Sequence, residues 1–365
     1  MSRAKAAYVS KPLEHIDYLD PFRAFAILQV VLIHGGNALL LRGLPSLDAE
    51  GSAAYALLHI IAHDSTIYFA VISGVLYGHL FWRRDHRVFM QGRLAKIGLP
   101  YTVITLVLTT LFWTVERLKT GSDADLPGLV VEFCRNIAFG DAWNTMWYIP
   151  VILVLYLISP ILWALQNRPE MRWILAVIII LPIIATRTGT MLTPQIFLYF
   201  LGSYTAGMWI GTDTEKKIDL LSKHVSALLL TLLGASLLLG WMFARQIDMW
   251  GVVSLRESVF YIQRLAASAL VLIWFRQWVR RGISPRIRSI SEYLAVASFG
   301  IYFVHGPLLR PIARLIGSWV SADQRWWVLA AAILATMIAG LLLSILIVEG
   351  VRRIVPKHAK RLIGA

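Results

Sequence analysis

The sequence predicts an all-α polytopic integral membrane protein with about ten transmembrane helices and both termini in the cytoplasm. Of its 365 residues 58% are hydrophobic, and the mean hydropathy of +0.65 lies far above that of soluble proteins. The apolar residues form blocks of roughly 17–25 residues, the length that a helix needs to cross a bilayer. Lysines and arginines gather in every second connection between the blocks. These three observations predict the fold class before any motif is considered.

The apolar blocks predict ten helices near residues 22–41, 60–81, 97–116, 146–165, 172–187, 193–210, 225–244, 258–276, 293–316 and 326–348. The first begins just after Pro21, and proline is acceptable at a helix start. The fifth is the shortest, and Pro182 interrupts it. The longest connection, about 117–145, is too short to fold alone. We therefore expect a cytoplasmic N-terminal segment at 1–21, one transmembrane domain at 22–350 and a basic cytoplasmic tail at 351–365.

The positive charge orients the chain and does not indicate nucleic-acid binding. With the N-terminus inside, most of the 35 lysines and arginines fall in cytoplasmic segments, as the positive-inside rule requires. The net charge of +14 is therefore explained by the orientation of the chain in the membrane. The partner expected from composition is the lipid bilayer. A single cysteine, Cys134, excludes an intrachain disulfide and a cysteine-rich metal site, and we expect no metal.

The most informative run extends from Tyr18 to His34. Arg23 opens a long apolar helix, and His34 lies eleven residues further along it. At a rise of about 1.5 Å per residue, the two lie roughly 16 Å apart along the helix axis. Ionisable side chains inside membrane helices are costly, and they usually line a pathway or a site. We expect Arg23 at the cytoplasmic face and His34 in the outer half of the membrane.

Other polar residues are expected at the depth of His34. His305 sits about twelve residues into an outward-running helix, and Arg264 lies in the outer half of an inward-running one. Asp64 enters the second helix from outside, close to His59 and His63. This predicts a polar cluster in the outer half, in which a neutral histidine could accept a proton. The alternative is that an intramembrane histidine only hydrogen-bonds a neighbouring helix.

Basic residues also precede the third helix. Arg93 and Lys96 are three positions apart, so on a helix they share a face and could bind one anionic group. The alternative is that basic cytoplasmic loops serve topology alone.

Together these motifs resemble the acyltransferase 3 family, membrane-embedded bacterial enzymes that O-acylate sugars and other hydroxyl acceptors. The resemblance extends over nearly the whole chain, in the order that the family shows. It rests on Leu19-Asp-Pro-Phe-Arg23-Ala with His34, Tyr68-Phe-Ala-Val-Ile-Ser73-Gly74, Arg93-Leu-Ala-Lys96, Trp147-Tyr148 and Ser298-Phe-Gly-Ile-Tyr-Phe-Val-His305-Gly-Pro307. Lys96 stands where the family has a second arginine. Lysine keeps the positive charge but cannot bind a phosphate in the bidentate manner of arginine.

The resemblance implies that the protein transfers an acyl group, expected to be acetyl, from cytoplasmic acetyl-CoA to a hydroxyl. The acceptor would be a surface or exported glycan, or its lipid-linked precursor. Arg23, Arg93 and Lys96 would contact the CoA phosphates, and His34 would be the general base. His305 and Arg264 would orient substrate or stabilise the oxyanion. The expected location is the bacterial inner membrane, with glycan-biosynthesis proteins as partners.

The substrate-binding candidates are Ser73, Trp147 and Asp64. Ser73 could instead hold a transient acyl group, or, with Gly74 and Gly78, permit close helix packing. Two alternatives remain for the function as a whole. One is a transporter or flippase with a buried His/Arg site, and the other is an acyltransferase with succinyl or another acyl group.

Overall fold

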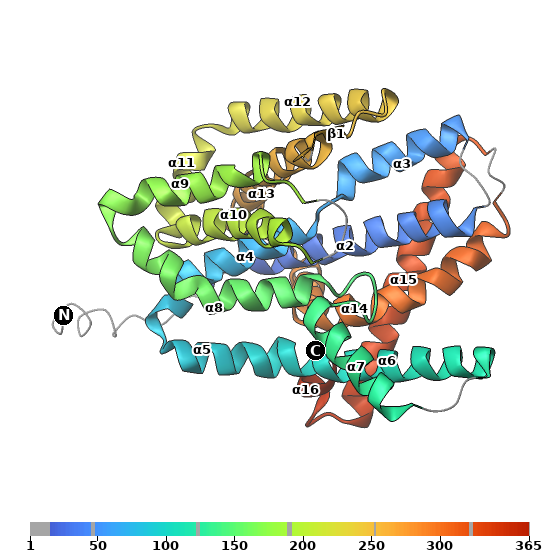
Figure 1. Cartoon of the computed structure of the whole chain (residues 1–365). Coiled ribbons are helices and arrows are strands. Elements are labelled where there is room, and N and C mark those ends of the chain that lie inside the picture. Colours follow the sequence, from blue (N-terminus) through green and yellow to red (C-terminus); the bar gives the residue numbers. More distant parts are fainter. Residues whose placement is uncertain are drawn as a thin grey trace.

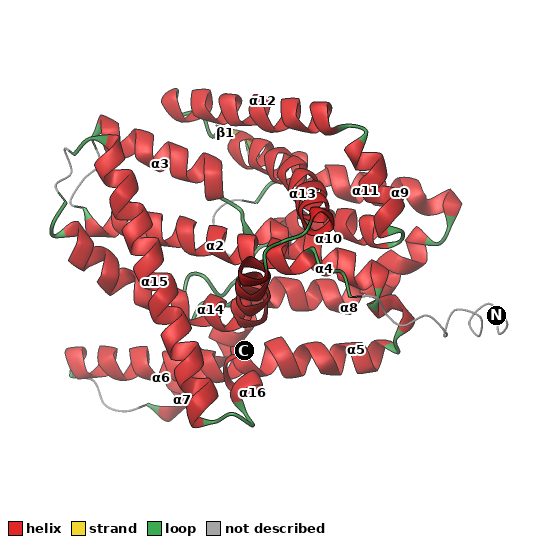
Figure 2. Ribbon diagram, turned by 180° about the vertical axis from the view of Figure 1, so that it is seen from behind, coloured by secondary structure: helices red, strands yellow, loops and turns green. Residues whose placement is uncertain are grey.

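The structure is a computed structural model that describes residues 15–44, 48–121, 125–187, 192–251, 253–320 and 324–364. The described chain is a bundle of α-helices with one short hairpin (Figures 1 and 2). The α-helices are α2 (Leu19–Ala38), α3 (Ala49–Ala62), α4 (Thr66–His79), α5 (His86–Arg93), α6 (Leu99–Thr120), α7 (Leu126–Phe139), α8 (Tyr148–Gln166), α9 (Arg172–Ile180), α10 (Pro194–Gly211), α11 (Thr214–Ser222), α12 (Val225–Ala244), α13 (Leu255–Arg281), α14 (Pro285–Gly317), α15 (Trp326–Ile354) and α16 (Ala359–Ile363).

Short helical turns and a hairpin complete the fold. The π-helical turns are η1 (Leu39–Gly43) and η3 (Leu94–Gly98), and the 3-10 turns are η2 (Phe81–Arg83), η4 (Pro169–Met171) and η5 (Leu181–Ile183). Strands β1 (Met249–Trp250) and β2 (Val253–Ser254) pair antiparallel, with Met249 opposite Ser254.

Seven helical segments are long and apolar enough to cross a membrane within the described ranges. They are Leu19–Gly43, Ala49–His79, His86–Thr120, Tyr148–Gln166, Val225–Ala244, Leu255–Arg281 and Trp326–Ile354. The structure therefore confirms a multi-pass all-α protein but does not confirm the predicted count of ten or the orientation of the termini. The other three predicted segments are helical as well, but α9 has only nine residues, and α10 and α14 are not apolar enough.

The second predicted helix, 60–81, is two helices with a break between them. α3 begins earlier than expected, at Ala49, and ends at Ala62, while α4 starts at Thr66. Asp64 lies in the break with φ 58°, a backbone conformation that cannot continue an α-helix. The break places polar backbone within a long apolar segment, which the membrane tolerates only where protein groups satisfy it.

The core forms where α2, α4, α8, α10 and α14 meet, and its side chains include Phe22, Tyr68 and Tyr204. α4 packs closely on α10, because a Cβ at Gly74 would meet the backbone of Tyr204. Gly78 makes the same kind of approach to Met208, so the packing interpretation of the Ser-Gly motif is confirmed. α2 lies against α14, which fixes the two predicted histidine-bearing helices side by side.

Two segments outside the predicted transmembrane helices contain helical residues. α7 lies in the connection 117–145 and packs on α6. In the predicted tail 351–365, α15 continues to Ile354, and α16 packs back on α6.

Candidate active site

His34 and His305 form a pair inside the bundle. His34 comes from α2 and His305 from α14, and their ring centroids lie 5.3 Å apart. His305 is completely buried, while His34 is partly accessible. The prediction that the two histidines lie at the same depth is confirmed.

The backbone fixes the proton on the His305 ring. Nδ1 lies 2.8 Å from the carbonyl oxygen of Tyr302 and 3.1 Å from that of Ile301. Because a carbonyl oxygen can only accept, Nδ1 carries the hydrogen, and Nε2 of the neutral ring keeps its lone pair. This Nε2 is buried and has no hydrogen-bond partner among the described residues. His305 thus presents an acceptor and no donor at Nε2.

Two hydroxyls are also buried without a partner in the described part of the chain: that of Thr145, which lies against Gly306, and that of Tyr148, whose ring is 6.5 Å from the Tyr302 ring. The backbone of Thr145 is hydrogen-bonded to α14, because the Tyr302 hydroxyl of that helix donates to the Thr145 carbonyl oxygen. Trp143 of the same loop covers Gly306, where a Cβ would meet its indole. Unsatisfied buried polar groups are rare and call for an explanation, and a bound substrate is one.

Arg23 and His34 lie on one face of α2. Eleven residues at about 100° each return to within about 20° of the starting direction. Arg23 lies within electrostatic range of Asp20 on its own helix and of Tyr156 and Arg93 from two other segments. Arg93 itself packs over the ring of Phe81 at 4.3 Å and of Tyr156 at 5.4 Å. The structure thus places two of the three predicted phosphate-binding residues together.

Lys96 differs from Arg93 in its surroundings. It is exposed on the π-helical turn η3, whereas Arg93 is half-buried at the end of α5. The expected common face assumed α-helical spacing, and a π-turn changes that spacing.

Hydroxyl side chains lie between the arginines and the histidine pair. The Tyr156 hydroxyl and Ser73 Oγ share a hydrogen bond of 3.0 Å. Tyr148 lies within electrostatic range of both Tyr156 and Tyr302. The Tyr302 ring is 5.8 Å from that of His305. These contacts form a polar track, which we define as Tyr156, Ser73, Tyr148 and Tyr302, from Arg93 to the histidine pair.

Arg264 does not contact either histidine of the pair in any hydrogen bond that the structure records. Its guanidinium donates to the carbonyl oxygens of His63 at 2.6 Å and Ile60 at 2.9 Å, and to the Tyr68 hydroxyl at 3.2 Å. These carbonyls belong to the last turn of α3 and the break, where a helix has no internal donors. Arg264 therefore caps the broken helix, and its expected contact with substrate stays a prediction.

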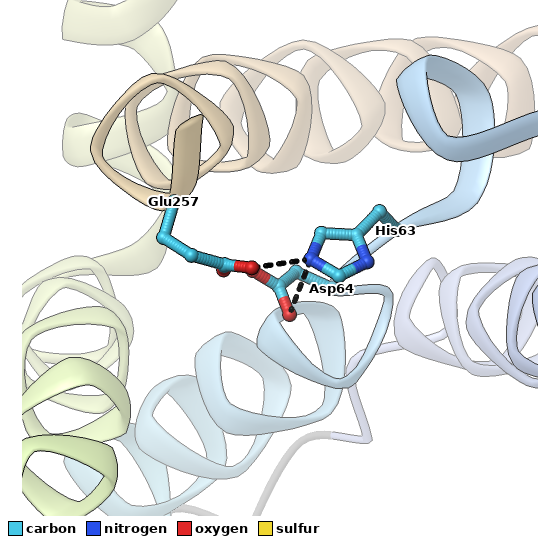
Figure 3. Close-up of side chains that lie close together, drawn as sticks. All are labelled: His63, Asp64 and Glu257. Carbon is cyan, nitrogen blue, oxygen red and sulfur yellow. Dashed lines mark hydrogen bonds and ion pairs between the residues drawn. The ribbon is translucent and has the colours of Figure 1, made fainter. Parts of the chain in front are cut away.

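Asp64 belongs to an ionic cluster that we define as His63, Asp64, Arg187, Tyr199 and Glu257. Of these, Figure 3 draws His63, Asp64 and Glu257. Arg187 pairs with Asp64 and, at 3.2 Å, with Glu257 at the start of α13. Glu257 Oε1 lies 2.9 Å from His63 Nε2, and the Tyr199 hydroxyl donates to Asp64 at 2.5 Å. Asp64 is thus held by protein groups, which favours a structural role over the predicted contact with substrate.

The cluster also has the spacing of a metal site, since one ligand atom from each of His63, Asp64 and Glu257 lies within 4.8 Å of the others. Arg187 stands where a cation would be, because its guanidinium pairs with both carboxylates and lies 3.2 Å from His63 Nε2. The donor set is therefore already compensated by a protein cation. The absence of a metal stays a prediction.

Trp147 is buried beside the same cluster. The Arg187 guanidinium lies 5.5 Å from its ring centroid, and the indole also packs on Phe200. Arg187 and Tyr199 were not expected from the sequence, in which 123 residues separate Arg187 from Asp64. A signal was present in Arg187 itself, a lone charge between two apolar blocks.

No curated protein and no solved structure matches this chain. The sequence model of one family, described as an acyltransferase domain, matches residues 16–349, which is nearly the whole chain. The match includes Arg23, His34, Arg93 and His305. The chain therefore belongs to the acyltransferase 3 family, as its motifs predict, and is a membrane acyltransferase by family.

Proposed function

We propose that the protein is an O-acyltransferase that moves an acetyl group from cytoplasmic acetyl-CoA to a hydroxyl of a surface or exported glycan, or of its lipid-linked precursor. The observation that carries the proposal is the arrangement along α2. Arg23 and His34 lie on one face of α2, about 16 Å apart by helical rise. His305 of α14 joins His34 at one end, Arg93 of α5 joins Arg23 at the other, and the polar track lies between them. The bacterial inner membrane is the location that we propose with it.

The arginine end suits the phosphates of the donor. Arg23 and Arg93 bring two positive charges together from α2 and α5, and such a pair is held more readily when an anion lies between the charges. Lys96 adds a third charge at the exposed side. The polar track supplies hydroxyls for the amide groups of the pantetheine arm, which need hydrogen-bond partners inside a membrane protein.

At the histidine end, the acceptor oxygen attacks the thioester carbonyl carbon, so that a C–O bond forms as the C–S bond breaks. His34 accepts the proton from the hydroxyl, and that proton passes to the CoA sulfur, which leaves as a thiol. His305 presents only a lone pair at Nε2, so it orients the hydroxyl or the His34 ring. The unpartnered hydroxyls of Thr145 and Tyr148 are donors for the oxyanion.

The test uses the purified full chain with acetyl-CoA or succinyl-CoA and a panel of methyl glycosides. Thiol release and the mass of the acylated glycoside report transfer. His34→Ala should lower transfer by 10²–10⁴-fold, the usual contribution of a general base. His224→Ala, at an exposed histidine that begins α12, is the matched control.

The same variants separate the enzyme from a transporter, an alternative that the broken α3–α4 segment makes worth testing. If His34→Ala kept wild-type transfer while glycoside flux into vesicles collapsed, the transport function would replace the enzymatic one. Comparing the two donors in the same assay identifies the acyl group.

A further inference from the structure

A polar cleft of about 320 Å³ opens between α7 and the loop 140–147. We call it the α7 cleft. Its lining side chains carry two carboxylates, one guanidinium, two amides and one indole, from Glu132, Asp141, Arg135, Asn136, Asn144 and Trp147. The cleft lies outside the histidine pair, the polar track and the ionic cluster described above, although Trp147 touches Arg187 of that cluster.

The lining suits a hydroxyl-rich, uncharged ring. Carboxylates and amide oxygens accept hydrogen bonds from hydroxyls, and amide N–H groups and the guanidinium donate to them. Two carboxylates beside one arginine disfavour a strongly anionic ligand, and so many polar groups disfavour an apolar one. Trp147, which is buried, adds an apolar wall to this lining.

Two of the lining residues are held in place. Asn136 is buried, its side-chain Nδ2 donates to the Thr109 hydroxyl at 2.9 Å, and its backbone carbonyl oxygen accepts from the Tyr101 hydroxyl at 2.9 Å. Trp147 is fixed by the Arg187 guanidinium that lies on its ring. Binding groups that are ordered beforehand lose less entropy when a ligand arrives.

The loop 140–147 separates the cleft from the histidine pair. Asp141, Asn144 and Trp147 face the cleft. Trp143 and Thr145 alternate with them and face α14, where Trp143 covers Gly306, the residue after His305. The Arg310 guanidinium, one turn further along α14, packs over Trp143 at 4.2 Å. A ligand in the cleft is therefore separated from His305 only by the loop 140–147.

We propose that the α7 cleft binds the carbohydrate portion of the acceptor and that the loop 140–147 presents its hydroxyl to the histidine pair. The proposal rests on the proposed function for the identity of the reaction, but the cleft and its chemistry stand independently of catalysis. It assigns recognition of the acceptor to Asn144, Asp141 and Trp147.

The test measures binding without turnover. Saturation-transfer NMR on the full chain in nanodiscs is recorded with methyl glycosides of a hexose, a deoxyhexose and a hexuronic acid. We expect a neutral glycoside to bind, and Asn144→Ala or Asp141→Asn to weaken it at least tenfold. Both side chains are exposed, so the variants should fold. Asn167→Ala, at an exposed asparagine on the other end of α8, is the matched control.

Three outcomes would overturn the proposal: binding of no glycoside, binding that is unchanged in Asn144→Ala and Asp141→Asn, or an equal loss in Asn167→Ala. His34→Ala distinguishes this proposal from the proposed function. If glycoside binding persists in His34→Ala and wild type shows no acyl transfer, the cleft stands and the enzymatic reaction does not.

Discussion

The contact between His34 and His305 predicts that the two histidines act as one unit. Their rings are 5.3 Å apart, and the backbone fixes His305 so that its free lone pair belongs to the same site. Replacing either residue by alanine should cost 10²–10⁴-fold in kcat/KM, which is about 3–5 kcal/mol at 1.36 kcal/mol per decade. Once His34 is absent, His305 has no proton transfer to support.

The double variant His34→Ala/His305→Ala should therefore be no worse than the poorer single variant. Independent contributions would add, for a loss of about 6–10 kcal/mol, so the two models differ by about 3 kcal/mol or more. That gap exceeds the usual scatter of additive pairs, about 0.3–0.5 kcal/mol. The prediction is thus decided by one comparison of three variants with wild type.

The assay follows release of the CoA thiol at saturating acetyl-CoA over many turnovers. Many turnovers are needed because Cys134 is exposed and contributes one thiol per chain. Thermal unfolding of each variant in detergent controls for misfolding. A double variant that loses the product of the two single factors would refute coupling, and wild-type activity in His305→Ala would remove His305 from the site.

Three further predictions follow from the packing and charge of the described residues. Asp64→Asn leaves the charge of Arg187 partly uncompensated and should destabilise the fold by about 3 kcal/mol in denaturant unfolding. This is near the low end for a broken buried ion pair, because Glu257 still pairs with Arg187. A change below about 0.5 kcal/mol would show that the pair is not formed. Gly74→Ala should destabilise the fold by about 1–3 kcal/mol, because the added Cβ would meet the α10 backbone. In Gly234→Ala the added Cβ has no described atom within 4 Å, so this variant should be neutral or more stable by up to about 1 kcal/mol. Equal effects of the two variants would contradict the close approach of α4 and α10. Arg93→Gln should raise the KM for acetyl-CoA about tenfold and leave that for an acetyl thioester without phosphates unchanged, and an equal rise for both donors would place Arg93 outside phosphate binding.

The length and apolarity of the blocks were enough to locate most helices. α12 coincides with the predicted 225–244, because His224 and Arg245 interrupt the apolar pattern sharply at both ends. The same reasoning could not find the break at Asp64. Hydropathy continues through residues 60–81, and the break depends on Arg187 and Arg264, which lie far along the chain and satisfy the freed groups.

For the site, depth was predictable and side-chain direction was not. Counting residues along two helices placed His34 and His305 at one level, and the structure brings them into contact. The same count placed Arg264 at that level, yet its guanidinium turns to the end of α3. Tyr148 and Thr145 were missed as site residues because a hydroxyl carries no charge, and its burial without a partner is visible only in three dimensions.

The ionic cluster gives a physical reason why two carboxylates can lie near the histidine pair. Asp64 is buried and Glu257 is half-buried, both near His63, and His63 is within electrostatic range of His34. Uncompensated carboxylates at this distance would favour a protonated His34, and an imidazolium cannot accept a proton from an acceptor hydroxyl. Arg187 pairs with both carboxylates and removes most of that field. The arginine that pairs with Asp64 at the helix break therefore also reduces the negative field that would otherwise reach the proposed base.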